Sequence, residues 1–194
     1  MSQRIAVYGG SFNPFGKHHQ DIIRWLIEEG KFDLVLVVPA AAHALKPNLP
    51  EFVHRYNMTL LGVNDLRYNG CPSLPYGKDP QTTGIEMEML RDQKAPIYTI
   101  DLLRRVKKGW GRDLGKGEAE IRFAIGPDVP AELDQWHAVN EIESEFGFVE
   151  VPVFSMRATE LRKMIQTGTR GWENHVPSPV VRYIEMHELY KEVS

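Results

Sequence analysis

The chain has 194 residues, of which 42% are hydrophobic, and carries a formal net charge of −3 with a sequence pI near 6.2. This length predicts one domain, since a chain of this size can bury about 70% of its unfolded surface around a single core. The acidic balance argues against nucleic acid or an anionic membrane as the main partner, because either needs a basic face. Cys71 is the single cysteine, which excludes an internal disulfide and a cysteine-rich zinc site and favours a reducing compartment, the cytoplasm.

The sequence gives no sign of a membrane span, a signal peptide, an internal repeat or a linker. No run approaches the roughly 20 apolar residues that a span needs, and residues 5–8 near the start are typical of a short strand rather than of a signal-peptide core. We therefore expect residues 1–194 to form one soluble, unprocessed domain.

The first predicted elements are a strand, a glycine turn and a helix. Residues 5–8 are an apolar run typical of a buried strand, Gly9-Gly10 is a turn, and the apolar pairs Ile22/Ile23 and Leu26/Ile27 lie on one face of a helix. This geometry leaves backbone N–H groups and the positive end of a helix dipole beyond the carboxyl end of the strand, where phosphate commonly binds.

A second buried strand follows and sets the fold class. Gly30 is expected to end the first helix as a left-handed cap, and 33–38 is an apolar strand stopped by Pro39. A helix between two such strands makes a right-handed βαβ unit of a doubly wound parallel sheet, whose ligands bind at the carboxyl ends of the strands. The loop 40–50 contains His43 and Lys46, and Lys46 could reach a phosphate.

The remaining elements are predicted from periodicity and from helix start and stop signals. A helix is expected over 51–63, an irregular loop over 68–80 and a half-exposed strand over 85–89, although a helix is possible there over so few residues. Further expected elements are listed in chain order: a helix from N-cap Thr99 through Val106, a strand over 121–125, a helix holding Trp136 and His137 and reaching Ile142, a strand over 147–154, a helix starting near Thr159 and closed by Gly168, and a helix from Ser178-Pro179 to about Lys191.

A lone Gly-Gly turn is weak evidence for phosphate binding, because many α/β proteins need such a turn for packing. A second Thr/Arg turn, at 157–162, also opens a helix at the end of a strand. Two anion-binding helix starts at one edge of one sheet favour a nucleoside triphosphate as the ligand.

These segments resemble a known enzyme family. Residues 9–14 with His19 resemble the nucleotidylyltransferase signature GG-x-F-[DN]-P-x-H-x-G-H, and residues 157–162 resemble its partner, S-S-T-x-I-R. Three further segments look like those of the bacterial nicotinate mononucleotide adenylyltransferases: 98–103, Gly126-Pro127-Asp128 followed by Trp136-His137, and the tail 176–190. The resemblance covers nearly the whole chain and implies a Rossmann-like three-layer αβα sandwich with a parallel sheet and a small helical C-terminal part.

The resemblance implies adenylyl transfer from ATP, usually with Mg²⁺, to a nicotinate or nicotinamide mononucleotide, with release of pyrophosphate in NAD biosynthesis. Such transfer needs in-line positioning and positive charge or donors around the phosphates more than covalent chemistry. We predict no protein ligand for the metal. The expected partners are these small molecules alone. The sequence leaves open whether the chain forms a homo-oligomer.

The implied roles fall on residues near the strand ends. His19 and Arg162 are implied as catalytic donors to the α-phosphate and the triphosphate. The implied nucleotide-binding positions are Gly9, Gly10, Ser11, Phe12, Gly126, Asp128, Arg157 and Thr159, and the implied substrate positions are Lys46, Tyr98, Thr99 and Trp136. Plainer interpretations are also open for four residues. Trp136 could be core packing, His43 and His54 could be surface or capping histidines, and Arg55 could be the partner of a carboxylate.

The chain departs from the family at points that bear on the chemistry. Gly16 stands where the signature has its first histidine, and His18 stands where it has glycine. Either His18 or Lys17 supplies the missing donor, or the enzyme is slow, or the protein binds nucleotides without turning them over. Arg157-Ala158 replaces the serine pair of the second motif, 146–155 is shorter than in the family and 69–94 is longer. The last two changes leave the choice between nicotinate and nicotinamide open. Another phosphorylated acceptor, such as phosphopantetheine, is the alternative among enzymes.

Overall fold

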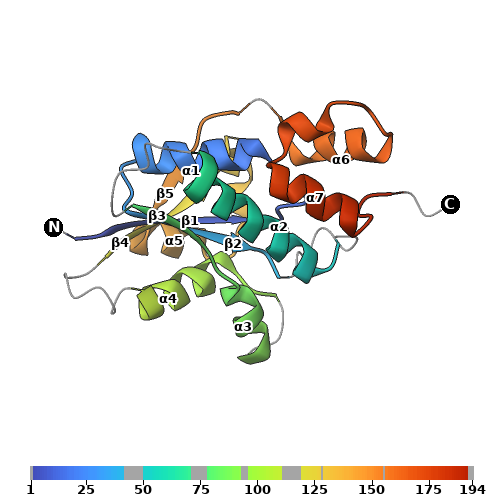
Figure 1. Cartoon of the computed structure of the whole chain (residues 1–194). Coiled ribbons are helices and arrows are strands. Elements are labelled where there is room, and N and C mark those ends of the chain that lie inside the picture. Colours follow the sequence, from blue (N-terminus) through green and yellow to red (C-terminus); the bar gives the residue numbers. More distant parts are fainter. Residues whose placement is uncertain are drawn as a thin grey trace.

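A parallel β-sheet forms the centre of the molecule (Figure 1). The structure is a computed structural model that describes residues 2–41, 50–70, 78–92, 96–110, 119–127, 129–154 and 156–191. Within them, five strands lie in the order β3-β2-β1-β4-β5 and every adjacent pair is parallel. The strands are β1 (Arg4–Gly10), β2 (Leu34–Pro39), β3 (Asp79–Thr82), β4 (Glu120–Ile125) and β5 (Phe148–Glu150).

Helices cover both faces of the sheet and enclose two hydrophobic cores. One core packs α1 (Lys17–Glu28), α2 (Phe52–Asp65), α6 (Ala158–Gln166) and α7 (Ser178–Met186) against the sheet, and the other packs α3 (Ile85–Asp92), α4 (Thr99–Trp110) and α5 (Val139–Glu145). The alternation along β1 divides its side chains, with Ala6 in the first core and Ile5 and Val7 in the second. This confirms the predicted three-layer αβα fold, with α6 and α7 as the small helical C-terminal part.

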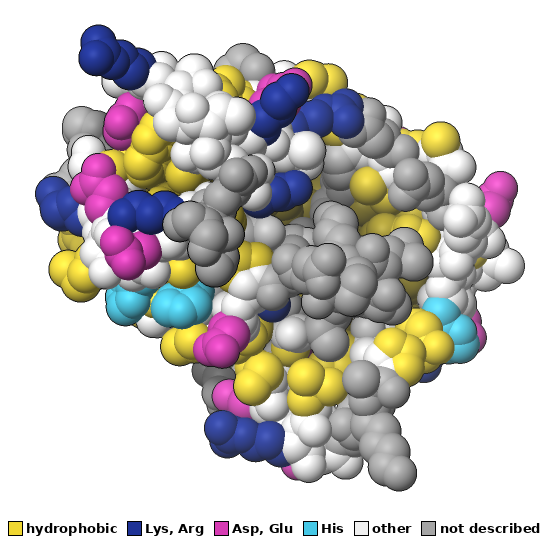
Figure 2. All heavy atoms as spheres, turned by 90° about the vertical axis from the view of Figure 1, so that its right-hand side faces the viewer, with side chains coloured by type: hydrophobic (Ala, Val, Ile, Leu, Met, Phe, Trp, Pro, Cys, Tyr) yellow, Lys and Arg dark blue, Asp and Glu magenta, His cyan; other side chains and the backbone are white. Residues whose placement is uncertain are grey.

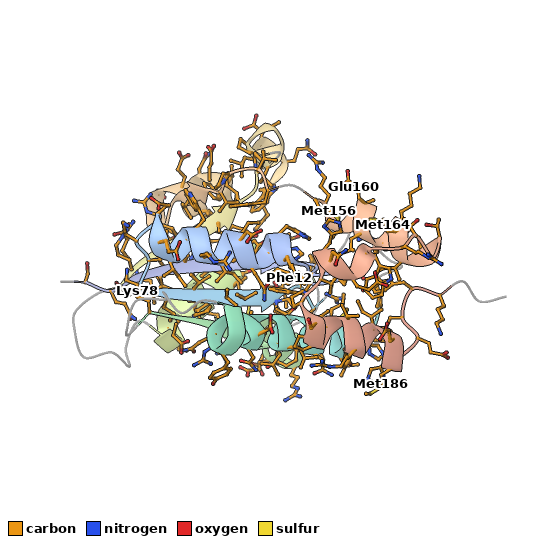
Figure 3. All side chains as sticks on the ribbon, turned by 45° about the horizontal axis from the view of Figure 1, so that its top comes forward. Phe12, Lys78, Met156, Glu160, Met164 and Met186 are labelled. Carbon is orange, nitrogen blue, oxygen red and sulfur yellow. The ribbon has the colours of Figure 1, made fainter. Side chains whose placement is uncertain are left out.

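The sheet order places the candidate site. The chain runs from β1 outward to β2 and β3, and then returns to the other side of β1 for β4 and β5. Ligands of such sheets bind where the order reverses, here between β1 and β4 at their carboxyl ends. Phe12 follows the carboxyl end of β1, whereas Lys78 precedes the amino end of β3. In Figure 3 the two labelled side chains therefore mark opposite ends of the parallel strands. No helix in the described part of the chain is long and apolar enough to cross a membrane.

The predicted strand over 85–89 is wrong. This segment lies in α3, because Ile85 and Met89, four residues apart, are the two side chains that it buries. The edge strand lies earlier, in β3, at the end of the segment that was predicted to be an irregular loop over 68–80. That segment begins with a π-helical turn over Leu66–Gly70, and its residues 71–77, with Cys71, lie outside the described part.

Other differences come from single backbone positions. Trp136 and His137 lie outside a helix, between a 3-10 helix (Val129–Gln135) and α5, because Ala138 takes a left-handed φ of 56° that interrupts the helical path. Helix α7 ends at Met186 rather than near Lys191, and left-handed Glu188 follows it.

Two further strand and helix ends are also shifted. Strand β5 covers only Phe148–Glu150 of the predicted 147–154, since Pro152 has no N–H to donate to a ladder. Lys31, with φ 57°, takes the left-handed position that was predicted for Gly30. Glycine is still needed at position 30, because a Cβ atom there would lie 2.7 Å from the Leu26 carbonyl oxygen.

Candidate active site

The loop between β1 and α1 is held by side chains from the far end of the chain. Arg162 on α6 donates from Nη1 to the Asn13 carbonyl oxygen at 2.6 Å and from Nη2 to Thr159 Oγ1 at 3.1 Å. The Tyr190 hydroxyl donates to Asn13 Oδ1 at 2.6 Å. The structure therefore brings together the two motifs that resemble parts of one triphosphate site, although 149 residues separate Asn13 from Arg162.

His19 lies in the first turn of α1 and is only 8% exposed. Its Nδ1 accepts a hydrogen bond from the Gly16 backbone N–H at 2.9 Å, so the neutral ring carries its proton on Nε2. Burial, and next the neighbouring His18, lower the pKa of His19 well below its usual value. Phe12 and Phe15 flank the ring at centroid distances of 5.1 Å. His19 is therefore a fixed, neutral N–H donor.

His18 fills the space beside Gly16. A Cβ atom on Gly16 would lie 2.7 Å from both Cε1 and Nδ1 of His18, closer than real Cβ contacts allow. The rings of His18 and His19 lie 3.8 Å apart, and His18 Nδ1 is buried without a hydrogen-bond partner among the described residues. Burial lowers the pKa of His18 to about 4, against a smaller opposing effect of Asp21. The side chain missing at position 16 is therefore replaced in space by the imidazole of His18, whereas Lys17 is exposed.

The predicted Gly9-Gly10 turn is wrong, because these glycines are the last two residues of β1 and pair with Val38 and Pro39 of β2. They have a packing role that the sequence did not indicate. A Cβ atom on Gly9 would lie 3.0 Å from Cζ of Phe123, and one on Gly10 would lie 3.2 Å from Cζ of Phe12. Both contacts are tighter than an ordinary van der Waals contact, so a side chain at either position would require the aromatic ring to shift by a few tenths of an ångström. We call this part of the site, with the β1–α1 loop, His18, His19 and the start of α6, the phosphate half.

A second cluster, here called the acceptor half, contains three of the predicted substrate positions, Tyr98, Thr99 and Trp136, together with His137. Tyr98 is 40% exposed, and its ring stacks on His137 at a centroid distance of 4.0 Å and an interplanar angle of 28°. Trp136 packs edge-on against Phe123 at 5.9 Å and against Phe148 at 6.3 Å, and is half-buried. Thr99 is the first residue of α4. Trp136 therefore combines packing on the sheet with a partly open ring.

The structure does not describe three of the residues considered in the sequence analysis: Lys46, His43 and Asp128. Gly126, directly after β4, has open space around its Cα. Arg157 is the N-cap residue of α6, and its backbone N–H donates to Glu160 Oε2 at 3.3 Å. His54, predicted to be a surface histidine, places Nδ1 3.0 Å from the Tyr183 hydroxyl.

Arg55 is a residue whose place the sequence did not reveal. It was predicted to pair with a carboxylate, but no ion pair within the described residues is formed by it, and its guanidinium donates to backbone carbonyl oxygens, including that of Ser11 at 3.1 Å. It is 2% exposed. An arginine in the first turn of an amphipathic helix gives no sequence signal for such burial.

Figure 2 views the molecule from the side of α6 and α7, the right-hand side of Figure 1. Several Lys and Arg side chains lie on the upper half of this face, interspersed with Asp and Glu, and histidines lie on its lower half. Figure 3 shows Phe12 beside the start of α6, with Met156 and Met164 nearby, in agreement with their packing against the same core.

Comparisons with known proteins find relatives that match along nearly the whole chain. The chain is 27% identical to a "probable nicotinate-nucleotide adenylyltransferase" of Leifsonia xyli, over 98% of this chain and 96% of that protein, and 29% identical to one of Desulfotalea psychrophila, over 96% and 81%. The chain is a homologue of the nicotinate-nucleotide adenylyltransferases. A scan against protein-family models finds no match.

Solved adenylyltransferase structures share the fold. One from Vibrio parahaemolyticus, described as a putative nicotinate-nucleotide adenylyltransferase, matches with a TM-score of 0.75 at 21% identity, over 98% of this chain and 97% of that one. The nicotinic acid mononucleotide adenylyltransferase of Plasmodium falciparum, solved with NaAD, matches with a TM-score of 0.72 at 18% identity, over 97% of both chains. These likenesses bear out the α/β architecture along the whole chain.

Proposed function

We propose that this chain transfers the adenylyl group of ATP to nicotinate (or nicotinamide) mononucleotide, forming the dinucleotide and pyrophosphate. The observation that carries the proposal is the meeting of the β1–α1 loop with α6 through Arg162 and Asn13, at the sheet edge where ligands of this fold bind. The names of the homologues support the same reaction, and they favour nicotinate over nicotinamide as the base of the acceptor.

In the proposed reaction, a phosphate oxygen of the mononucleotide attacks the α-phosphorus of ATP. The bond from that phosphorus to the bridging oxygen of the β-phosphate breaks, and pyrophosphate leaves with the bonding electrons. His19 donates from Nε2 to an α-phosphate oxygen as negative charge builds up there, where one preorganised donor can contribute about 3 kcal/mol. Because burial keeps the His19 ring neutral and Gly16 fixes its tautomer, this donor needs no reorganisation.

The leaving pyrophosphate would be stabilised by the start of α6. Thr159 and Arg162 lie one turn apart on that helix, and the free N–H groups of its first turn carry the positive end of the helix dipole. Gly9, Gly10, Ser11 and Phe12 would contribute backbone contacts from the opposite side of the crevice.

We propose Mg²⁺ as the partner of the ATP phosphates. The described residues contain no group of three or more His, Cys, Asp or Glu side chains placed to hold a metal ion. Phosphate oxygens are the usual ligands of this ion in nucleotide sites.

The acceptor half would bind the pyridine ring. Tyr98 and Trp136 present aromatic faces near the end of β4, and Thr99 adds a hydroxyl.

We further propose that the chain works as a single cytoplasmic domain. That it forms a homo-oligomer stays a prediction.

The test is pyrophosphate release from ATP and Mg²⁺ with nicotinate mononucleotide, nicotinamide mononucleotide and phosphopantetheine offered separately. We expect release with a pyridine mononucleotide. Release with phosphopantetheine alone would support another acceptor, and no release with any of the three would contradict the enzyme. In that last case, binding of an ATP analogue would identify a nucleotide-binding homologue, the second candidate, which Gly16 in place of the histidine favours.

A further inference from the structure

Arg55, in the first turn of α2, is a buried arginine whose guanidinium donates, among the described residues, to backbone carbonyl oxygens only. Nε donates to the Pro50 carbonyl oxygen at 3.0 Å, and Nη1 donates to the carbonyl oxygens of Ala40 at 2.7 Å and Ser11 at 3.1 Å. Nη2 lies 3.5 Å from the Ala41 carbonyl oxygen. A buried charge is costly unless it is well hydrogen-bonded, so this arrangement needs a structural or functional reason.

The accepting carbonyls belong to separate pieces of chain at the ligand-binding edge. Ser11 directly follows β1, Ala40 directly follows β2, and Pro50 lies just before α2. The β1 and β2 strands are neighbours in the sheet, and the Ala40 N–H also donates to the Gly10 carbonyl oxygen at 2.9 Å. One guanidinium therefore ties the chain directly after β1 to the end of β2 and to the start of α2.

Glu86, at the start of α3, contributes to this assembly from the opposite face of the sheet. Its carboxylate accepts the Ala41 N–H at 2.8 Å, and it is close enough to Arg55 for the two charges to attract. Burial raises the pKa of Glu86 to about 7, against the opposing effects of the Ala41 N–H and Arg55. Arg55 and Glu86 thus hold the Ala40-Ala41 peptides from two sides.

The arrangement needs an arginine in particular. A planar guanidinium presents donors in fixed directions and can reach three carbonyls at once, whereas an ammonium group is a single point of charge on a flexible stem. Lysine could keep the charge and most of the packing, but it could not hold the three carbonyls in the same geometry.

We propose that Arg55 is a positioning residue, which fixes the backbone directly after Gly9-Gly10 relative to the end of β2 so that both meet the substrates in one geometry. The inference rests on the proposed function, because it concerns the same crevice. Preorganised backbone positions matter most to transfer reactions that depend on alignment, where small displacements of the reacting groups are costly in rate. Arg55 itself touches no reacting atom in this proposal.

The test compares R55K with R67K, a matched control. Arg67 lies in the π-helical turn that follows α2 and pairs with Asp79 at 2.7 Å, away from the ligand-binding edge. At a temperature where thermal unfolding curves show both variants fully folded, we expect R55K to lose at least about tenfold in kcat at saturating substrates and to bind an ATP analogue more weakly. R67K should match the wild type in both. A folded R55K with wild-type kcat and analogue affinity would overturn the proposal.

Glu86 provides a second route that does not depend on the folding of R55K. Glu86→Gln keeps an oxygen that can accept the Ala41 N–H, whereas Glu86→Ala removes it, so E86A should lose more in kcat and analogue affinity than E86Q. Equal losses would count against the positioning of this peptide. If the wild type binds the analogue but releases no pyrophosphate, the proposed reaction fails, and analogue affinity still decides the role of Arg55.

Discussion

In the phosphate half of the site, His19 is 8% exposed and its tautomer is fixed by a backbone N–H, whereas in the acceptor half Tyr98 is 40% exposed and stacks on another surface ring, His137. The phosphate half is also tied together by Arg55, Arg162 and Tyr190. Transfer chemistry gains most from donors that need no rearrangement when charge develops. A more open aromatic surface can instead adapt to an acceptor, so the rate should depend on the first half and the choice of acceptor on the second.

Removing His19 tests the phosphate half most directly. We expect His19→Ala to lower kcat at least about 100-fold, since a lost preorganised donor costs about 3 kcal/mol of transition-state stabilisation, and to weaken ATP binding much less. Steady-state pyrophosphate release and calorimetry with an ATP analogue measure the two effects. His54→Ala is the control, because His54 contacts Tyr183 between α2 and α7. An unchanged kcat in His19→Ala would transfer the role to His18 or Lys17.

The burial of the histidines should make the protein sensitive to acid. The pKa of His18 falls from 6.5 to about 4 on folding, so the folded state resists protonation while the unfolded state takes up a proton. The stability from this group is present above pH 6.5 and is lost as the pH falls towards 4, by up to about 3 kcal/mol at 1.36 kcal/mol per pKa unit. Urea unfolding at pH 7 and pH 4.5 measures the loss, which His18→Asn should reduce. An equal loss in His18→Asn would show that other groups cause it.

Exchanging the residues at positions 16 and 18 tests whether His18 replaces the missing side chain. We expect His18→Gly to lower kcat at least about tenfold, as one donor is lost. Gly16→His alone should destabilise the fold, because its Cβ would lie 2.7 Å from the His18 ring. The double variant Gly16→His/His18→Gly removes that clash, leaves the tighter-than-usual contact of 3.2 Å with the His175 carbonyl oxygen, and should recover much of kcat. A double variant no faster than His18→Gly would mean that His18 only fills space.

The same contrast explains what could be predicted from the sequence. The strand and the helix around Gly9-Gly10 follow from local pattern, and β1, β2, β4, α1, α2 and α4 lie where periodicity placed them. The two glycines end β1 instead of forming the predicted turn. Positions that depend on tertiary contacts were missed: Arg55 is buried by carbonyls from three separate segments, and α3 was taken for a strand because eight residues are too few to separate the two periods. Trp136 lies outside the helix that was predicted for it, because the backbone at Ala138 is left-handed. No local sequence pattern indicates this conformation.

The acceptor half should give the smallest effect, and it should appear in KM for the mononucleotide. Trp136→Ala removes a ring that could stack on the pyridine, and such a stack contributes about 1 kcal/mol, which is about fivefold in KM. We expect KM for ATP to stay the same, because the phosphate half is untouched. Trp136→Phe keeps an aromatic face and should lose less.

Trp136 also packs against Phe123 and Phe148, so the substitution could act through the fold instead. Phe148→Leu is the matched control, since it changes the same packing without removing the candidate stacking ring. If Phe148→Leu raises KM for the mononucleotide as much as Trp136→Ala does, packing rather than stacking is responsible. If Trp136→Ala instead lowers kcat and raises KM for both substrates, the two halves do not act separately. The structural reason would be Phe123, which packs against both Trp136 and Gly9, so that a shift of its ring would also displace the carboxyl end of β1.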